Sequence, residues 1–211
     1  MLIEQIVLTF WIAYLVGAIP IAYLVSRLHG VDIFTIGSGN MGATNVARAV
    51  GTGWGLLTWA LDMVKGVGAI VIARQLISDH TSAVTMIAAI GVIMGHNWSI
   101  IVMMITGHLR GGKGAAAALG TWLIFIPPLL IVIAFGIWLA IIITTRFMSL
   151  AVLTMTSVIS LMIIGLVMVG YYEPVYVNYL IASGLIFFRH RDNIQRLLRG
   201  SERRFGESAT Q

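Results

Sequence analysis

One short uncharged segment has the residue types that bind anions: residues 37–45 read GSGNMGATN. Glycines allow backbone conformations with positive φ, and successive N–H groups in such turns form a concave anion site. Arg48 would share a helical face with Asn45. Hydroxyl and amide side chains add neutral donors, so the candidate contacts are Ser38, Gly39, Asn40, Thr44 and Asn45. We therefore predict an anion-binding loop rather than a plain connection.

Two nucleotide-binding patterns are matched in letters but not in context. Residues 37–42 spell G-x-G-x-x-G, which indicates dinucleotide binding only between a strand and a helix, and a long apolar run precedes it here. Residues 107–113 fit G-x-x-x-x-G-K, but Gly114 follows where a nucleotide P-loop needs Ser or Thr. A helix N-terminus with a lysine still suits phosphate, and alanines follow this loop. We predict a phosphate site rather than a topology signal alone, with contacts from Gly111, Gly112, Lys113 and Gly114.

Further polar residues interrupt or end the apolar runs. Asp62 and Lys65 lie three apart on one helical face. A charge within a membrane helix must be paired or face a cavity, so a structural ion pair and a phosphate contact by Lys65 are equally expected. A single histidine such as His96 is more often a hydrogen-bonded packing residue. His190 and Asn193 follow the last apolar run, and we expect them beside the glycine loops.

Composition indicates one integral membrane domain over residues 1–211. Apolar residues make up 59% of the chain and charged residues 10%, with a mean hydropathy of +0.96. Soluble proteins carry roughly 25% charged residues. The chain has no cysteine, and no cluster of metal-ligating residues stands out, so neither a metal nor a cofactor is expected. The net charge of +5 does not indicate nucleic acid, because the basic residues lie beside apolar runs or in the tail.

The uncharged runs predict an all-α fold of about seven transmembrane helices. One run is too long for a single span, and we expect it to form two helices that turn at Pro127 and Pro128. The runs are residues 6–26, 54–77, 81–107, 115–145, 147–170 and 175–188, and all are uncharged except 54–77, which Asp62 and Lys65 interrupt and Arg74 ends.

The basic residues predict the orientation. With the N-terminus outside and the C-terminus cytoplasmic, residues 189–211 form a basic cytoplasmic tail. Arg74, Asp79 and His80 then lie outside, and Lys65 lies within a helix. The other eleven of the thirteen basic residues face the cytoplasm, as the positive-inside rule requires: Arg27, Arg48, Arg110, Lys113, Arg146, Arg189, Arg191, Arg196, Arg199, Arg203 and Arg204. Every glycine-rich polar loop shares that face.

The order of the motifs resembles a known family, the bacterial acyl-phosphate:glycerol-3-phosphate acyltransferases of the membrane. The resemblance spans nearly the whole chain and rests on residues 37–45 with Arg48, 62–66 (DMVKG), 95–98 (GHNW), 111–114 (GGKG) and 189–197 (RHRDNIQRL). It departs from the family at Ser99, where proline is usual. The interval before the GGKG motif is also several residues longer than usual, with His108 and Leu109 in place of a more apolar approach.

The resemblance implies transfer of a fatty acyl group from acyl phosphate to the 1-hydroxyl of glycerol 3-phosphate. The products would be lysophosphatidic acid and phosphate, in the first step of phospholipid synthesis. It also implies a multi-pass protein of a bacterial plasma (inner) membrane with its active site on the cytoplasmic face. By motif position, the family's phosphate contacts fall on Ser38, Arg48, Lys113, His190 and Asn193.

Acyl phosphate has a good leaving group, so positioning and charge stabilisation can carry the catalysis. We expect direct attack by the glycerol hydroxyl, with Lys113 stabilising charge. The base is either a substrate phosphate oxygen or His190, and the sequence leaves both open. The expected partners are glycerol 3-phosphate, acyl phosphate and membrane lipid, and the oligomeric state stays open.

A transporter for a phosphorylated organic anion is the alternative function, because transporters also use broken helices and glycine-rich anion sites. It requires access from both faces of the membrane. The cationic loops are predicted on one face only, which favours the enzyme.

Overall fold

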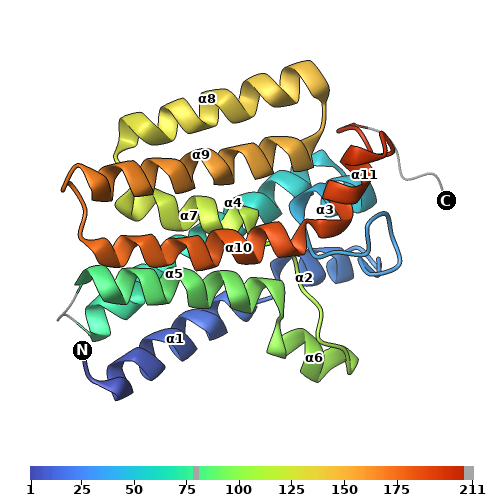
Figure 1. Ribbon diagram of the computed structural model, residues 1–211. Coiled ribbons are helices and arrows are strands. Elements are labelled where there is room, and N and C mark those ends of the chain that lie inside the picture. The colour runs from blue at the N-terminus through green and yellow to red at the C-terminus, as the bar shows by residue number, and fades with distance from the viewer. Residues whose placement is uncertain (78–80, 207–211) are drawn as a thin grey trace.

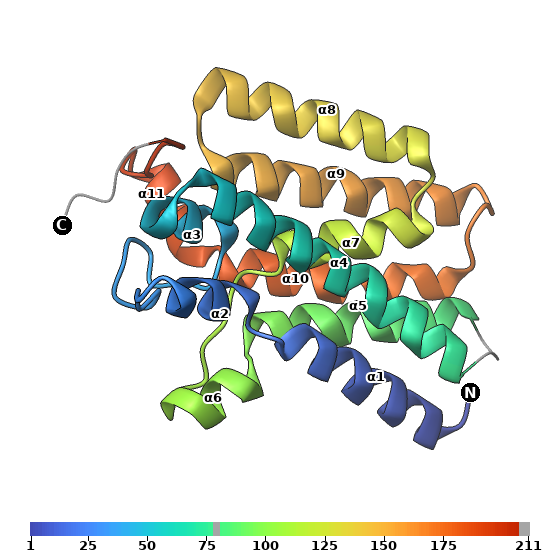
Figure 2. The ribbon, with the colours of Figure 1, turned by 180° about the vertical axis from the view of Figure 1, so that it is seen from behind.

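The computed structural model describes residues 1–77 and 81–206, and in that part of the chain it contains helices, loops and one isolated β-bridge between Ser99 and Arg110 (Figures 1 and 2). Asp79, His80 and the last five residues of the predicted tail lie outside the described residues. The helices are α1 (Ile3–Ala18), α2 (Ile21–Leu28), α3 (Ala43–Val50), α4 (Thr52–Leu76), α5 (Thr81–Asn97), α6 (Ile100–Thr106), α7 (Ala115–Phe125), α8 (Pro128–Thr145), α9 (Met148–Met168), α10 (Tyr179–Arg189) and α11 (Arg191–Leu198), with a 3₁₀ turn, η1, at Pro174–Asn178.

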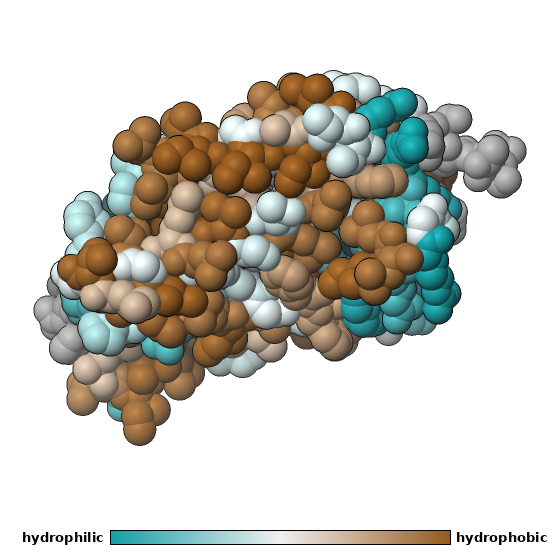
Figure 3. Space-filling model, turned by 45° about the horizontal axis from the view of Figure 1, so that its top comes forward, coloured by the Kyte–Doolittle hydropathy of each residue, from teal (hydrophilic) through white to brown (hydrophobic). Residues whose placement is uncertain are grey.

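The all-helical, membrane-spanning fold class is confirmed in outline. Among the described residues, four helical segments are long and apolar enough to cross a membrane, namely Ile3–Leu28, Thr52–Leu76, Pro128–Thr145 and Met148–Met168. The shorter helices α5 and α7 are also apolar. Figure 3 shows hydrophobic side chains over most of one face and hydrophilic ones gathered at one end. An apolar exterior of this kind is suited to lipid rather than to water.

The chain reverses direction at the proline pair, as predicted. Helix α7 ends at Phe125 and α8 begins at Pro128, and the two helices run in opposite directions (Figure 1). Proline lacks the N–H of a helix interior, so Pro127 ends one helix and Pro128 can begin the next. As a result α2, α3, α11 and the loop that leads into α7 lie at the same end of the bundle.

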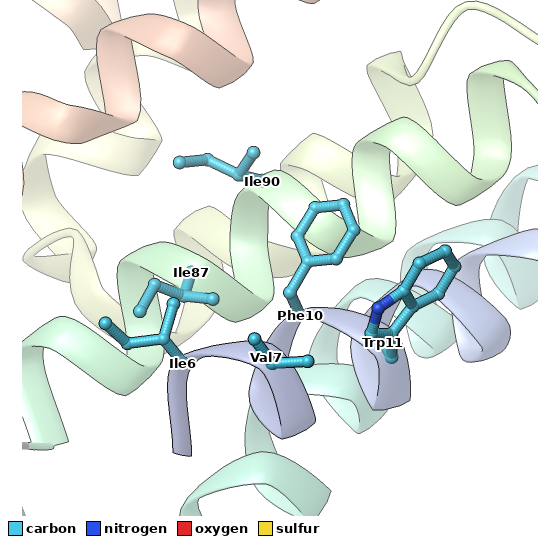
Figure 4. Close-up of a pocket in the computed structure, with 6 residues that line it drawn as sticks. All are labelled: Ile6, Val7, Phe10, Trp11, Ile87 and Ile90. Atoms are coloured by element: carbon cyan, nitrogen blue, oxygen red, sulfur yellow. The ribbon is translucent and has the colours of Figure 1, made fainter. Parts of the chain in front are cut away.

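Small residues allow the central helices to approach closely. A Cβ on Gly91 or Gly95 of α5 would overlap the backbone of α1, at the carbonyl groups of Phe10 and Tyr14 respectively. Small residues at this spacing allow such close helix packing in membrane proteins. At the end of the bundle remote from the glycine loops, Figure 4 shows an apolar hollow between α1 and α5, lined by Ile6, Val7, Phe10, Trp11, Ile87 and Ile90.

One predicted span was wrong: residues 81–107 do not form a single helix. Helix α5 ends at Asn97, and α6 begins at Ile100 in a different direction (Figure 1). Ser99 causes the break, because its Oγ accepts a hydrogen bond from the N–H of Val102 and caps α6. The same Oγ donates to the carbonyl oxygen of Ala18 at 2.5 Å, which ties the break to the end of α1.

Candidate active site

The first glycine loop is organised by the side chain of Asn45. Its Oδ1 accepts a hydrogen bond from the N–H of Ser38 at 3.2 Å. Its Nδ2 lies within hydrogen-bond reach of three loop carbonyls, those of Ile33, Ile36 and Asn40. Gly37 and Gly39 have positive φ, which lets the chain curl around this amide. Asn45 is therefore occupied in shaping the loop.

The remaining predicted residues of this segment lie around the start of α3. Ser38 is exposed, Gly39, Asn40 and Thr44 are half-buried, and the amide of Asn40 donates to the carbonyl of Ser38 at 3.2 Å. No side chain caps the N-terminus of α3 at Gly42. An uncapped helix start leaves backbone N–H groups available to an anion.

The second glycine loop is held by backbone contacts on both sides. The N–H of Gly112 donates to the carbonyl of His96 at 2.9 Å, and the N–H of Met41 donates to the carbonyl of Gly111 at 3.4 Å, which joins the two loops. The Arg189 guanidinium donates to the carbonyls of Gly112 and Gly111 at 2.9 and 3.2 Å. A Cβ on Gly111 or Gly112 would overlap these neighbours, so both positions require glycine.

Lys113 projects from this loop to the last segment of the chain. Its Nζ donates to Oδ1 of Asn193 at 2.5 Å, although 80 residues separate the two. Nδ2 of Asn193 donates to Glu202 at 2.6 Å, so the amide is fixed with its oxygen toward the lysine. Gly114 follows with φ +82° and begins α7 without a side-chain cap. The structure thus brings two predicted site residues into direct contact.

Glu202 anchors this arrangement from the tail. Its carboxylate accepts hydrogen bonds from Ser149 at 2.7 Å and from Arg196 at 2.8 Å, besides the one from Asn193. Burial alone would raise the pKa of Glu202, but the hydrogen bonds from Ser149, Asn193 and Arg196 outweigh it and hold the pKa below its usual value. The carboxylate therefore stays ionised and holds Asn193 in place at neutral pH.

The site is electropositive. Burial lowers the pKa of Lys113 to about 8; the carboxylate of Glu202 opposes this change, and the positive charges of Arg196, Arg189 and Arg48 add to it. Because the charge of Arg48 lowers the pKa of Lys113, the two side chains belong to the same cationic site. A cluster of cations that repel one another is stabilised by a bound anion, because the anion pairs with all of them at once.

His190 lies between α10 and α11 and is 3% exposed. Its Nδ1 lies 2.8 Å from the carbonyl oxygen of Ile186. A carbonyl only accepts, so in the neutral ring Nδ1 carries the proton and Nε2 keeps its lone pair. Burial, together with the positive charge of Lys113, lowers the pKa of His190 to about 4. The ring is therefore neutral at pH 7 and can accept a hydrogen bond from a hydroxyl group.

Behind the glycine loop lies a buried polar cluster of Asp62, Lys65 and His96. Lys65 Nζ is 2.8 Å from Oδ1 of Asp62 and donates to the carbonyl of Ile19 at 3.1 Å. His96 Nδ1 is 3.6 Å from the same Asp62 oxygen. Of the two alternatives left open for Lys65, the structure contains the ion pair. His96 is 5% exposed, as expected of a packing residue, but among the described residues its Nδ1 has no hydrogen-bond partner; its backbone carbonyl accepts the N–H of Gly112.

Two residues of the site were missed by the sequence analysis as contacts. Arg189 was recognised only as part of a motif, yet it holds both carbonyls of the glycine loop. Glu202 was not singled out at all, because it belongs to a tail that was described only as basic and cytoplasmic. The available signal was its charge: it is one of only eight acidic residues, and it stands among arginines.

The fold and the site together define a class: a helical membrane protein with a cationic, glycine-rich site at one end that suits phosphorylated ligands. Comparison with known proteins narrows the class. The model of the glycerol-3-phosphate acyltransferase family matches residues 7–200, and this chain belongs to that family.

Relatives and solved structures agree with this assignment. A glycerol-3-phosphate acyltransferase of Thermus thermophilus is 40% identical over 202 residues, which cover 95% of this chain and 96% of the relative. That of Aquifex aeolicus is 37% identical over 194 residues, covering 92% and 95%. The crystal structure of PlsY, an integral membrane glycerol 3-phosphate acyltransferase, in its glycerol 3-phosphate form has a TM-score of 0.82 and 36% identity, covering 95% of this chain and 96% of that one. The lysophosphatidic acid form has a TM-score of 0.79 and also 36% identity, covering 95% of each chain.

Proposed function

We propose that this protein transfers a fatty acyl group from acyl phosphate to the 1-hydroxyl of glycerol 3-phosphate, forming lysophosphatidic acid and phosphate in the first step of phospholipid synthesis. The observation that carries the proposal is the contact between Lys113 and Asn193 within a cluster of arginines. Both substrates carry phosphate, and the substrate and product named for the related structures are the acyl acceptor and the acylated product of this reaction.

In this proposal the cations hold the two phosphates and the reaction needs no acyl-enzyme. The glycerol hydroxyl attacks the carbonyl carbon of acyl phosphate, the C–O bond to phosphate breaks, and phosphate leaves. Lys113 and Arg48 stabilise the charge on the leaving phosphate. The proton of the attacking hydroxyl passes to a phosphate oxygen. Nε2 of His190 is a neutral acceptor, and it orients glycerol 3-phosphate by accepting a hydrogen bond from the other hydroxyl group of that substrate. The pKa of His190, about 4, lies below the second pKa of a phosphate group, about 6, so the phosphate oxygen is the stronger of the two candidate bases.

The predicted phosphate contacts fall into two groups in this proposal. The phosphates are held by Lys113, Arg48, Ser38 and Asn193, together with the neutral groups of Asn40, Thr44, Gly111 and Gly114. The N–H groups of Gly39 and Gly112 already donate to the carbonyls of Ile36 and His96, so these two glycines shape the loops. Asn45 instead shapes the first loop as a positioning residue. Lys65 supports the site from behind through Asp62.

We further propose a single transmembrane domain over residues 1–211 with seven transmembrane segments in a bacterial inner membrane. The pair α1–α2 would form one segment, and α4, α5, α7, α8, α9 and α10 the others. The polar end of the bundle would face the cytoplasm, where glycerol 3-phosphate is present, with the N-terminus outside. The reversal at Pro127 supports this count, because it returns the glycine loops and α11 to the same end.

The purified protein in detergent micelles tests the proposal directly. Acyl phosphate and labelled glycerol 3-phosphate should give labelled lysophosphatidic acid, whereas acyl-CoA in place of acyl phosphate should not. A Lys113→Ala variant serves as the control for contaminating activity. No product with donors of several chain lengths, together with uptake of a phosphate ester by liposomes that carry the protein, would favour the transporter instead.

A further inference from the structure

Helix α6 stands apart from the rest of the molecule. Figures 1 and 2 show it beside the bundle, near the end of α5 and away from the long helices. Only Val102 on this helix is fully buried, in a small apolar cluster that includes Ala22, Ile33 and Val46. We call Met103, Met104, Ile105 and Leu109 the tip. Their side chains are exposed, with Met104 80% exposed, Ile105 54% and Leu109 50%. A folded helix thus presents a strongly apolar tip.

This protruding helix is capped at both ends. Ser99 caps the N-terminus of α6, and Gly107, with φ +74°, ends it through a hydrogen bond from its N–H to the carbonyl of Met103 at 2.8 Å. The N–H of Ser99 donates to the carbonyl of Arg110 at 3.0 Å and closes the base. Thr106 Oγ1 donates to the carbonyl of Val102, which is the buried anchor. Its exposed tip is therefore ordered rather than a frayed loop.

The residues around the tip suit one binding partner, an anionic lipid surface. No acidic residue occurs between residues 81 and 172, whereas Arg110 follows Leu109 directly. Arg110 is itself ordered, with its guanidinium 5.0 Å from the ring of Phe34. Apolar side chains beside a cation, with no acidic residue nearby, suit the surface of an anionic lipid leaflet. The long, unbranched side chains of Met103 and Met104 also suit the irregular packing of acyl chains.

We propose that the tip of α6, formed by Met103, Met104, Ile105 and Leu109, inserts into the anionic lipid leaflet at the polar end of the bundle and holds residues 108–114 at the membrane surface. The base of the protrusion supports this coupling. Arg110 closes it, and the next residues, Gly111 and Gly112, are bonded to Met41 and His96. The lipid anchor and the glycine loop are therefore adjacent parts of one short segment. This inference does not depend on which acyl donor the protein uses.

The absence of cysteine makes the test direct, because one introduced thiol is the only label site. Met104→Cys, labelled with the environment-sensitive fluorophore NBD, is reconstituted into vesicles of anionic phosphatidylglycerol with or without lipid that carries a doxyl quencher near the headgroup. Exposed Thr35 in the first polar loop provides the water control as Thr35→Cys. Ile143 on α8, which is 70% exposed, provides the lipid control as Ile143→Cys.

We expect the label at position 104 to show blue-shifted emission and doxyl quenching close to those at position 143, and at least severalfold stronger than at position 35. Emission and quenching at position 104 that match the water control would overturn the proposal. So would efficient disulfide cross-linking of unlabelled Met104→Cys between two copies, because it would make a second copy the occupant. Leu109→Cys is a second label position on the same tip, and it must give the same result.

Discussion

Replacing Lys65 with methionine should destabilise this protein far more than replacing Lys65 and Asp62 together. The side chains of the pair are 6% and 3% exposed, and Nζ lies 2.8 Å from Oδ1. Lys65→Met leaves the carboxylate of Asp62 buried beside His96 without its cation. The double variant Asp62→Asn/Lys65→Met removes the charge as well.

The magnitude follows from the burial of the pair. Removing one partner of a buried ion pair costs about 3–5 kcal/mol of unfolding free energy, whereas replacing both is often neutral. At this chain length, about 3–5 kcal/mol corresponds to a fall in melting temperature of about 6–20 °C. The double variant still loses the hydrogen bond from Lys65 to the carbonyl of Ile19, which costs about 1 kcal/mol. It should therefore melt only a few degrees below the wild type.

Tryptophan fluorescence during heating in detergent measures these melting temperatures, and the rate of acyl transfer is followed in parallel below the transition. Asp62→Asn alone is the matched control, because it leaves the lysine cation without its carboxylate. The reasoning would be refuted if Lys65→Met had the melting temperature of the wild type while its KM for glycerol 3-phosphate rose. That result would instead make Lys65 a substrate contact.

Further outcomes are expected at three residues. Lys113 must be charged to bind phosphate, and its pKa is about 8, so kcat/KM should fall as the pH rises through about 8. In a measured pH–rate profile, Lys113→Arg should move this fall to higher pH. Gly112→Ala should raise KM by about tenfold to a hundredfold, because its Cβ would overlap the His96 ring; unchanged kinetics would show that the loop can shift. Glu202→Gln should lower activity less than Glu202→Ala, since only the amide keeps a hydrogen-bond acceptor for Asn193. The carboxylate of wild-type Glu202 stabilises the folded protein above the ordinary pKa of a glutamate. This stabilisation should be lost as the pH falls through the lowered pKa of Glu202, and acid unfolding of the wild type and of Glu202→Gln measures the difference.

Much of the fold could be predicted from the sequence because membrane segments obey simple rules of length, charge and proline. The reversal at Pro127 is an example, since an uncharged run too long for one span contained the only proline pair. The break at Ser99 could not be predicted in this way. It depends on a serine that caps α6 and reaches the carbonyl of Ala18, and neither charge nor proline marks it.

The candidate site was predictable where neighbouring residues act together and obscure where distant ones meet. Glycines around Lys113 indicate a phosphate loop through their local sequence. The role of Asn45 as the organiser of its loop depends on carbonyls up to 12 residues away. The contact of Glu202 with Asn193 depends on how the chain turns after α11, where Gly200 has φ +68°, and sequence spacing does not specify that turn.

One isotope measurement tests the central claim most directly. The purified protein is given acyl phosphate with ¹⁸O in the bridging position between carbon and phosphorus, together with labelled glycerol 3-phosphate. Attack at the acyl carbon predicts lysophosphatidic acid and phosphate in equal amounts, with the ¹⁸O retained in the phosphate. Phosphate that lacks the ¹⁸O, or the absence of lysophosphatidic acid, would contradict acyl transfer at this site.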